Sequence, residues 1–266
     1  MKALEINNLH MTFEKGTVNE NHVLKGIDFE AEAGDFITII GGNGAGKSTF
    51  LNSVAGSFAI DDGNIKIVDK DVTKQNEYTR AKLIGRVFQD PRLGSATRMT
   101  IEENMAIALK RGKHRTLRFG SNQKDRDLFH EKIKTLDLGL EDRMKMDVGL
   151  LSGGQRQALT LLMATMVQPK LLLLDEHTAA LDPKTAQHVL ELTDKIVTEQ
   201  NITTLMVTHN MNDALKFGNR LIMLHQGRIV VDLSKEDKEK ATVEDLIKLF
   251  RANSGTELED DSVLLV

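Results

Sequence analysis

The fold is decided by one stretch, GDFITIIGGNGAGKSTF, at residues 34–50. Its apolar run, 36–40, has the length and β-branched content of a strand that is buried on both faces. Four glycines follow between positions 41 and 46, and glycine lets backbone N–H groups converge on an anion with no Cβ in the way. Lys47 and Ser48 then begin a helix, so the stretch predicts a complete phosphate-binding loop in its strand-to-helix context.

The residue types of this loop indicate its chemistry. A helix N-terminus suits phosphate oxygens, the Lys47 ammonium suits the β and γ oxygens of a nucleotide, and the Ser48 hydroxyl suits Mg²⁺. A glycine-rich turn that binds nothing would not need a lysine and a serine at this spacing. The loop alone would suit kinases and GTPases equally. We expect it to bind phosphate through Gly41, Asn43, Gly44, Ala45, Gly46, Lys47, Ser48 and Thr49.

Composition narrows the class of protein. The 266 residues are 40% apolar and 28% charged, which is typical of a soluble globular chain with a sizeable core. The net charge of −4 gives no basic field, so we expect no nucleic-acid partner. The chain contains no cysteine, which excludes disulfides and thiolate metal sites. The first eight residues carry Glu5 and two asparagines, unlike a signal peptide, and the apolar runs are too short to span a bilayer.

The order of patterns along the chain predicts an α/β fold. Strand patterns dominate residues 2–40, helical periodicity dominates 92–168, and strands alternate with helices again from 170 onward. This order indicates a mainly parallel sheet with helices on its faces. We predict a single domain at residues 1–252, with antiparallel strands at its N-terminus. Its core comprises residues 1–91 and 169–252, and an inserted helical subdomain comprises about 92–168. The acidic residues 253–266 are expected to form a loose tail.

A second strong signal is the run LLLLDE at 171–176. Four leucines indicate a central strand, and ligands bind beyond the carboxyl ends of such strands. Asp175 is placed to hold Mg²⁺, and Glu176 is placed to orient or deprotonate a water that attacks the γ-phosphate. The alternative is a strand that ends in a solvated acidic turn, which an intact phosphate loop makes the minor option.

A third signal is LSGGQ at 151–155, directly before a helical pattern. The Ser152 hydroxyl, two glycine N–H groups and a helix N-terminus make a second anion site. A serine N-cap followed by flexible glycines explains the same residues, and spacing alone leaves both explanations open.

These motifs, in this order, resemble those of the nucleotide-binding subunit of ATP-binding-cassette (ABC) transporters. LSGGQ is that family's signature, and the resemblance runs through nearly all of residues 1–232. It implies a P-loop NTPase fold of the ABC ATPase type, with ATP and Mg²⁺ as cofactors and ATP hydrolysed to ADP and phosphate. It also implies a head-to-tail homodimer, in which each ATP lies between the phosphate loop of one copy and the signature residues of the other, Ser152, Gly153, Gly154 and Gln155.

Three further residues match positions that the family uses. Gln89 matches the glutamine loop, which touches Mg²⁺ and the attacking water. Asp182 matches the loop that contacts the second subunit, and His209 matches the histidine that hydrogen-bonds the γ-phosphate. Plainer explanations are a polar strand end, an N-cap before Pro183 and a structural histidine. The order of the motifs favours the functional roles.

Phe13 falls where the family places an aromatic residue that stacks on adenine, although a phenylalanine in an apolar strand is more often part of the core. Two positions depart from the family pattern: His177 stands where proline is usual, and Thr165 where arginine is common. Neither departure puts hydrolysis in doubt, and we do not expect His177 to bind a metal.

The basic run KRGKHRTLR occupies residues 110–118. A solvated loop is the first expectation. The competing hypothesis is contact with lipid headgroups or with a cytoplasmic loop of a membrane partner, because the helical subdomain is the family's docking surface.

The resemblance implies a peripheral subunit on the cytoplasmic side of the cell membrane. It would drive transmembrane permease subunits and work with a separate substrate-binding protein. The sequence has no fused membrane segments, which favours an importer. The segments DEHTAALD and VTHNMN resemble a little-characterised amino-acid-type importer branch, aromatic amino acids included.

Two other classes of function fit the sequence less well. A soluble ABC ATPase that acts on DNA or ribosomes usually carries a long coiled coil or two cassettes, and this sequence has neither. A regulatory module that holds ATP without turnover is disfavoured by Glu176 and His209.

Overall fold

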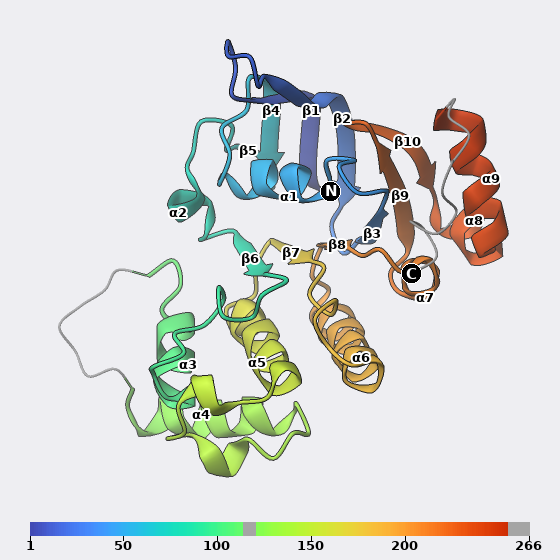
Figure 1. The fold of residues 1–266 in the computed structure, drawn as a ribbon. Coiled ribbons are helices and arrows are strands. Elements are labelled where there is room, and N and C mark those ends of the chain that lie inside the picture. Colours follow the sequence, from blue (N-terminus) through green and yellow to red (C-terminus); the bar gives the residue numbers. More distant parts are fainter. Residues whose placement is uncertain (114–120, 255–266) are drawn as a thin grey trace. The chain divides into compact units, whose positions relative to one another are not determined.

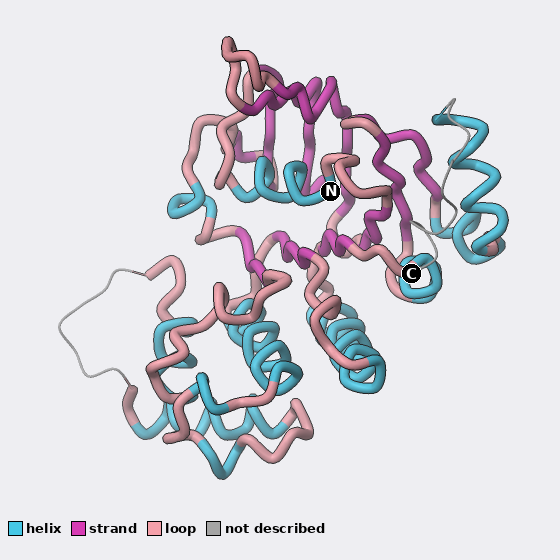
Figure 2. Tube along the Cα trace, in the orientation of Figure 1, coloured by secondary structure: helices cyan, strands magenta, loops and turns pink. Residues whose placement is uncertain are grey.

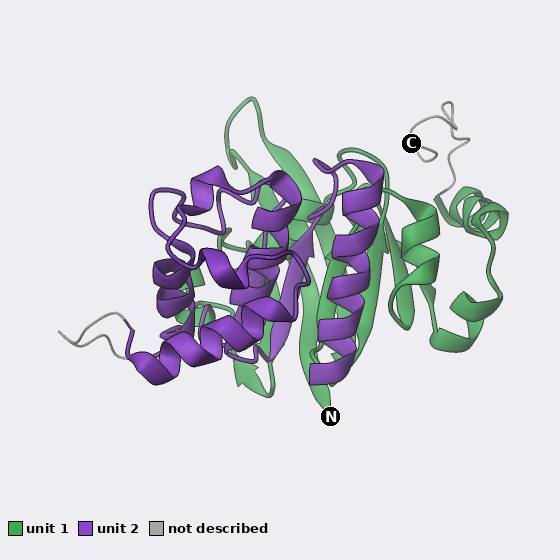
Figure 3. Cartoon of the chain, turned by 90° about the horizontal axis from the view of Figure 1, so that it is seen from below, with its two compact units in different colours: residues 1–80, 201–266 green, residues 81–200 purple. Residues whose placement is uncertain are grey.

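The computed structural model describes residues 1–113 and 121–254. Contacts divide the chain into two compact units (Figure 3). Unit 1 comprises Met1–Arg80 and Asn201–Val266, and unit 2 comprises Ala81–Gln200. Each unit contains both strands and helices (Figure 2), so the chain has the predicted α/β character.

Unit 1 contains an antiparallel sheet with the strand order β2-β1-β4-β5 (Figure 1). Alternate residues of β1 are buried, but the alternation slips by one between Ile6 and Leu9. The pairing register shifts there, and Asn8 has a left-handed φ of 49°, as in a β-bulge. The bulge keeps both apolar runs on one face. The strands are β1 (Lys2–Phe13), β2 (Asn21–Glu32), β4 (Asp62–Ile67) and β5 (Lys70–Asp71).

A second group of strands in unit 1 has the order β10-β9-β3-β8. β3 (Phe36–Ile40) is buried along its length between β8 (Thr204–Val207) and β9 (Arg220–His225), both parallel to it. This position explains the uncharged sequence FITII. β10 (Arg228–Leu233) pairs antiparallel with β9. The helices of unit 1 are α1 (Lys47–Ala55), α2 (Glu77–Arg80), α7 (Met211–Lys216), α8 (Lys235–Lys240) and α9 (Val243–Ser254).

Arg80 fixes the C-terminal end of α1. Its buried guanidinium donates to the carbonyl oxygens of Ser53 and Val54, at 2.8 Å each. A positive charge is favourable at a helix C-terminus. Gly56 ends the helix with a φ of 81°, and a Cβ there would lie 2.7 Å from Arg80 Nε. The helix that begins at the phosphate loop is therefore held at its other end.

Unit 2 contains a parallel strand pair, β6 (Ile84–Val87) and β7 (Leu171–Asp175). Helix α5 (Gly153–Met166) is its centre, because it packs against β6 and three other helices. Its apolar face, which includes Leu159 and Leu162, is buried. The remaining helices are α3 (Ile101–Leu109), α4 (Gln123–Lys134), α6 (Pro183–Gln200) and the 3-10 turns Glu141–Arg143 and Val148–Leu150.

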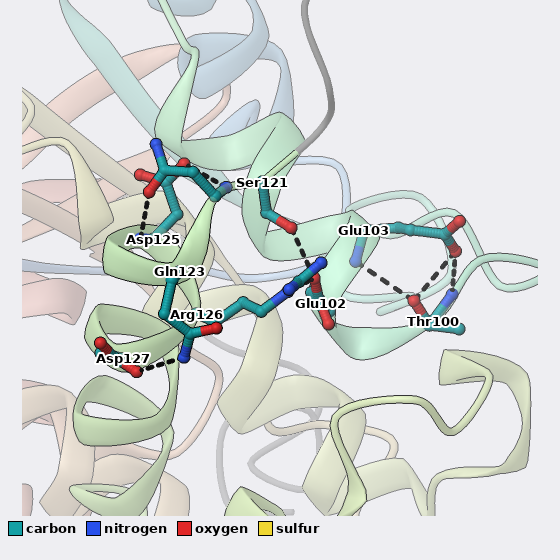
Figure 4. A network of polar contacts seen from close by, with 9 residues as sticks. Thr100, Glu102, Glu103, Ser121, Gln123, Asp125, Arg126 and Asp127 are labelled. Atoms are coloured by element: carbon teal, nitrogen blue, oxygen red, sulfur yellow. Dashed lines mark hydrogen bonds and ion pairs between the residues drawn. The ribbon is translucent and has the colours of Figure 1, made fainter.

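Polar contacts join the first turns of α3 and α4 (Figure 4). Glu102 accepts hydrogen bonds from Arg126 Nε, at 2.8 Å, and from the Ser121 hydroxyl. These bonds lower the pKa of the Glu102 carboxyl. Each helix also begins with a capping box, which satisfies its first N–H groups.

Arg111 belongs to the basic run but is only partly exposed. It donates to the carbonyl oxygen of Ala164 at 2.6 Å and to that of Val167, at the end of α5. Burial lowers the pKa of its guanidinium. Arg111 therefore lies in a turn, as expected for a loop, but its guanidinium also stabilises a helix C-terminus. Residues 114–118 of the run lie outside the described residues.

As predicted, strands dominate residues 2–40, helices dominate 92–168, and further strands and helices follow from 170 onward. α2 and α8 were not anticipated, because they are short polar segments. Of the expected tail, residues 253–254 belong to α9 and residues 255–266 lie outside the described residues. The domain boundaries stay a prediction. Within 1–113 and 121–254, no helix has the length and hydropathy of a membrane span.

Candidate functional site

The phosphate loop is the turn from β3 into α1 in unit 1. Backbone φ is 154° at Gly41, 75° at Gly44 and 100° at Gly46, values that a residue with a Cβ rarely adopts. At Gly41 a Cβ would also lie 2.2 Å from the carbonyl oxygen of Leu224 on β9. At Gly42 and Gly44 it would meet no described atom within 4 Å, so the loop is open there.

Lys47 lies folded over this loop. Its Nζ donates to the carbonyl oxygens of Gly41, at 2.7 Å, and Gly42, at 3.2 Å, and its side chain is buried. Among the described residues, no side chain caps the N-terminus of α1, and its first turn contains no acidic residue. An open loop, a helix N-terminus and an ammonium fit the phosphates of a nucleotide. Ser48 is exposed beside them.

Strand β8 brings His209 to the same edge as this loop. β3 and β8 are parallel neighbours with Ile39 opposite Val207, and Thr208 N donates to Ile39 O at 3.1 Å. The carboxyl ends of parallel strands meet at one edge of a sheet, so the phosphate loop and His209 leave it next to each other. His209 is exposed, and the N-cap of α7, Asn210, follows it.

Phe13 is the last residue of β1 and is half-buried. Its ring meets that of Phe58 edge to face, with centroids 5.3 Å apart. This contact fixes the plane of the Phe13 ring and leaves part of it accessible. Phe58 was not singled out from the sequence, which offers no periodic signal at that position.

In unit 2, β6 and β7 bring Gln89 and the carboxylate pair to one edge. Val87 lies opposite Leu174 in the parallel register, Gln89 follows two residues later, and Asp175 follows directly. Gln89 is exposed and Asp175 is half-buried.

Glu176 has a left-handed backbone, with φ at 44°. This conformation costs about 1–3 kcal/mol for a residue with a Cβ, and it occurs preferentially at functional sites. His177 beside it is buried, and its Nε2 donates to Thr193 Oγ1 at 3.1 Å, because that hydroxyl itself donates to Val189 O. Burial lowers the pKa of His177 to about 4. His177, neutral and buried, therefore fixes the chain directly after Glu176 to α6.

The LSGGQ segment begins α5 with a capping box. Ser152 Oγ accepts from Gln155 N at 3.2 Å, and Gln155 Oε1 accepts from Ser152 N at 3.1 Å. The N-cap explanation of this segment is confirmed. The anion site stays a prediction, and Ser152 and Gly153 are exposed at the start of the helix.

Gln157 was missed by the sequence analysis. It is buried on α5, and its Nε2 donates to the Phe88 carbonyl oxygen at 3.2 Å, one residue before Gln89. The available signal was a polar residue on an apolar helix face. Thr165, which departs from the family pattern, is also buried, and its hydroxyl donates to Leu161 O at 2.9 Å.

Asp182 caps α6. Its Oδ1 accepts from Thr185 N at 3.1 Å, and Pro183 is the first helical residue, so the predicted N-cap is confirmed. The hydrogen bonds from Thr185 lower the pKa of the Asp182 carboxyl. Its contact with a second copy of the chain stays a prediction.

The donors predicted for Mg²⁺ are side-chain oxygens, the ligand type that this ion prefers. Ser48 lies in unit 1, and Gln89 and Asp175 lie in unit 2. Across the described ranges, no group of three or more histidines and carboxylates is arranged to hold a metal. Mg²⁺ keeps several waters and takes one or two carboxylates together with phosphate oxygens, and Asp175 supplies a carboxylate of this kind.

Gly154 packs α5 against α6. A Cβ at this buried position would lie 2.1 Å from Thr185 Cγ2. We expect Gly154→Ala to lower the free energy of unfolding by about 1–3 kcal/mol. Thr185→Ser removes Cγ2 and should restore most of that loss, as measured by urea unfolding. Equal stabilities of Gly154→Ala and the unaltered chain would contradict this packing, and Thr185→Ser alone is the matched control.

Comparisons with known proteins agree on one family. Residues 24–179 match the family model described as "ABC transporter". A tyrosine transport ATP-binding protein of Clostridioides difficile is 46% identical over 93% of this chain and 98% of that protein. The methionine import ATP-binding protein MetN of Clostridium tetani is 35% identical over 77% of this chain and 62% of that protein.

Solved structures show the same fold. The dimeric, post-hydrolysis structure of the ATP-binding cassette MJ0796, bound to ADP and Pi, aligns with a TM-score of 0.75 at 28% identity, covering 87% of this chain and 98% of that one. The predicted fold class, a P-loop NTPase of the ABC ATPase type, is therefore confirmed. The chain belongs to the ABC transporter family, as an ATP-binding subunit with ATPase activity.

Proposed function

We propose that the chain hydrolyses MgATP to drive import of an aromatic amino acid, tyrosine being the leading candidate. The observation that carries the solute class is the 46% identity to the tyrosine transport protein, along almost the full length of both chains. The methionine importer subunit is 35% identical over a smaller share of the chain. The solute would cross through separate permease subunits, after delivery by a separate substrate-binding protein.

The phosphates of ATP are assigned to the loop between β3 and α1. Lys47 sits buried over the loop and supplies the positive charge, and the N-terminus of α1 supplies N–H donors. Phe13, held edge-on by Phe58, would stack on adenine. The loop residues assigned to ATP are Gly41, Asn43, Gly44, Ala45, Gly46, Lys47, Ser48 and Thr49.

The chemical step is assigned to residues at the carboxyl ends of the parallel strands. Bound Mg²⁺, held by Ser48, Gln89 and Asp175, would neutralise charge on the β and γ oxygens. Glu176 takes a proton from the attacking water, and His209 donates a hydrogen bond to the γ-phosphate. The left-handed backbone of Glu176 supports a functional constraint on that residue.

The site is proposed to be complete only in a head-to-tail homodimer. Ser152, Gly153, Gly154 and Gln155 of one copy would close over ATP held by the other, with Asp182 beside them. The exposure of Ser152 and Gly153 and the dimeric form of the related cassette support this arrangement. The subunit would bind peripherally to its permeases on the cytoplasmic side of the membrane.

The proposed solute is tested by disrupting the gene in its host and measuring uptake of labelled tyrosine, with labelled methionine as the control solute. We expect tyrosine uptake to fall at least about tenfold and methionine uptake to be unchanged, because ATP supplies the driving force for one import system. Complementation with the unaltered gene should restore uptake, and Glu176→Gln should not. Unchanged tyrosine uptake in the disrupted strain would refute the solute assignment.

A further inference from the structure

Lys238 is a buried cation that the proposed chemistry does not use. It lies on α8 and is 3% exposed. Its Nζ donates to the carbonyl oxygens of Phe217 and, at 3.1 Å, Gly218, and to Thr38 Oγ1 at 3.4 Å. All three partners are oxygens that can accept, which matches the three protons of an ammonium. Burial lowers the pKa of Lys238 to about 8, because removal of the ammonium from water disfavours its charged form.

Two of the partners of Lys238, Phe217 and Gly218, lie at the C-terminal end of α7. This helix has only six residues, too few to be stable alone in water. Its N-terminal end is capped by Asn210, whose side chain accepts from two backbone N–H groups. Phe217 is the residue that caps its other end, and a positive charge there is favourable. Lys238 therefore fixes the end of α7 that Asn210 does not.

Thr38 connects Lys238 and α7 to the strand that precedes the phosphate loop. It is fully buried on β3, the strand that leads into Gly41. Its hydroxyl donates to Ala214 O on α7 at 2.9 Å and accepts from Lys238. One buried polar cluster thus joins the strand before the phosphate loop, the helix after His209, and α8.

Helix α9, which follows α8, packs on α7 and β3 through an apolar core. Leu246 and Phe250 of α9 share a buried core with Met211 and Ala214 of α7 and Ile40 of β3. Helices α8 and α9, within residues 235–254, therefore both contact the α7 segment. These residues lie beyond the range 24–179 that the family model matches.

We propose that Lys238 is a positioning residue for ATP hydrolysis: by fixing α7 and Thr38, it holds His209 at the edge where the phosphate loop begins. The C-terminal segment 235–254 then sets the rate of turnover through this contact. The inference rests on the proposed function, in which His209 contacts the γ-phosphate.

The test is a double-mutant cycle on the full chain, measured as steady-state ATPase activity with Mg²⁺. Lys238→Met keeps the length of the side chain and removes the charge. We expect kcat to fall about tenfold with KM for ATP within about twofold, since a small misplacement of a catalytic group is enough for such a loss. In a His209→Ala background, Lys238→Met should cause no further loss. Lys240→Met, at an exposed position of the same helix, is the matched control.

The outcomes separate positioning from simple destabilisation. Equal fold losses in both backgrounds, or a raised KM with unchanged kcat, would overturn the inference. If Lys238→Met does not fold, Thr38→Val carries the test, because it removes only the hydroxyl of the cluster, and it should lower kcat in the unaltered background alone. Absence of ATP hydrolysis by the unaltered chain would instead refute the proposed function.

Discussion

Replacing Glu176 with glutamine is expected to lower ATP turnover by about 10²–10⁴-fold while the affinity for ATP stays within about twofold. The amide has the shape of the carboxylate but cannot accept a proton from water. Glutamine also tolerates the left-handed φ of 44° no worse than glutamate, so the backbone should be unchanged. The loss should therefore be confined to the chemical step.

Phosphate release measures this turnover, and equilibrium binding of a fluorescent ATP analogue measures the affinity. In the proposed dimer, the variant should accumulate as a nucleotide-bound dimer on size-exclusion chromatography, because ATP is no longer removed. Glu199→Gln, an exposed change on α6, is the matched control and should behave as the unaltered chain. Equal turnover in Glu176→Gln and the control would remove the assigned role.

Lys47→Met is expected to weaken ATP binding by about 100-fold, because loss of hydrogen bonds from a charged donor costs about 1.5–3 kcal/mol. The ammonium now bonds to the carbonyl oxygens of Gly41 and Gly42, and it must share these bonds with a phosphate. The variant should thus lose ATP binding and also make the loop less rigid, because both contacts of the ammonium with the loop carbonyls are lost.

Isothermal titration with ATP measures the affinity, and thermal unfolding without nucleotide measures the second effect. Lys74→Met, at an exposed position of the same unit, controls for the loss of one positive charge. An unchanged dissociation constant for ATP in Lys47→Met would show that the loop does not hold the phosphates.

The parts of the site that the sequence could predict are those built from neighbouring residues. The strand, the glycines and Lys47 lie within one stretch, and the leucine run of β7 indicates a buried strand whose carboxyl end carries Asp175. Parallel pairing then places strand ends at a common edge, as the register of β3 with β8 shows. Residue types within each stretch, together with the rule that parallel strands end at a common edge, were sufficient to predict these parts of the site.

The remaining features depend on contacts between distant residues or on backbone conformation. Lys238 reaches Thr38 across 200 positions, and no periodic pattern indicates that a polar helix such as α8 would bury one of its lysines. Arg111 likewise reads as part of a solvated basic run until the end of α5 is seen beside it. The left-handed φ of Glu176 has no signal in residue type, because glycine is the residue that such positions usually carry.

In the proposed dimer, the capping box of α5 would limit how tightly one copy holds the nucleotide bound to the other. Ser152 and Gln155 already satisfy each other's N–H groups within one chain. In the proposed dimer, a phosphate that accepted from the N–H of Ser152 or Gln155 would replace a bond that the helix makes to itself, so the net gain is the difference between two sets of hydrogen bonds. When the two copies separate, Ser152 and Gln155 form their hydrogen bonds to each other again, and neither backbone N–H is left without an acceptor. Such an exchange favours a dimer that opens readily once its nucleotide has been hydrolysed.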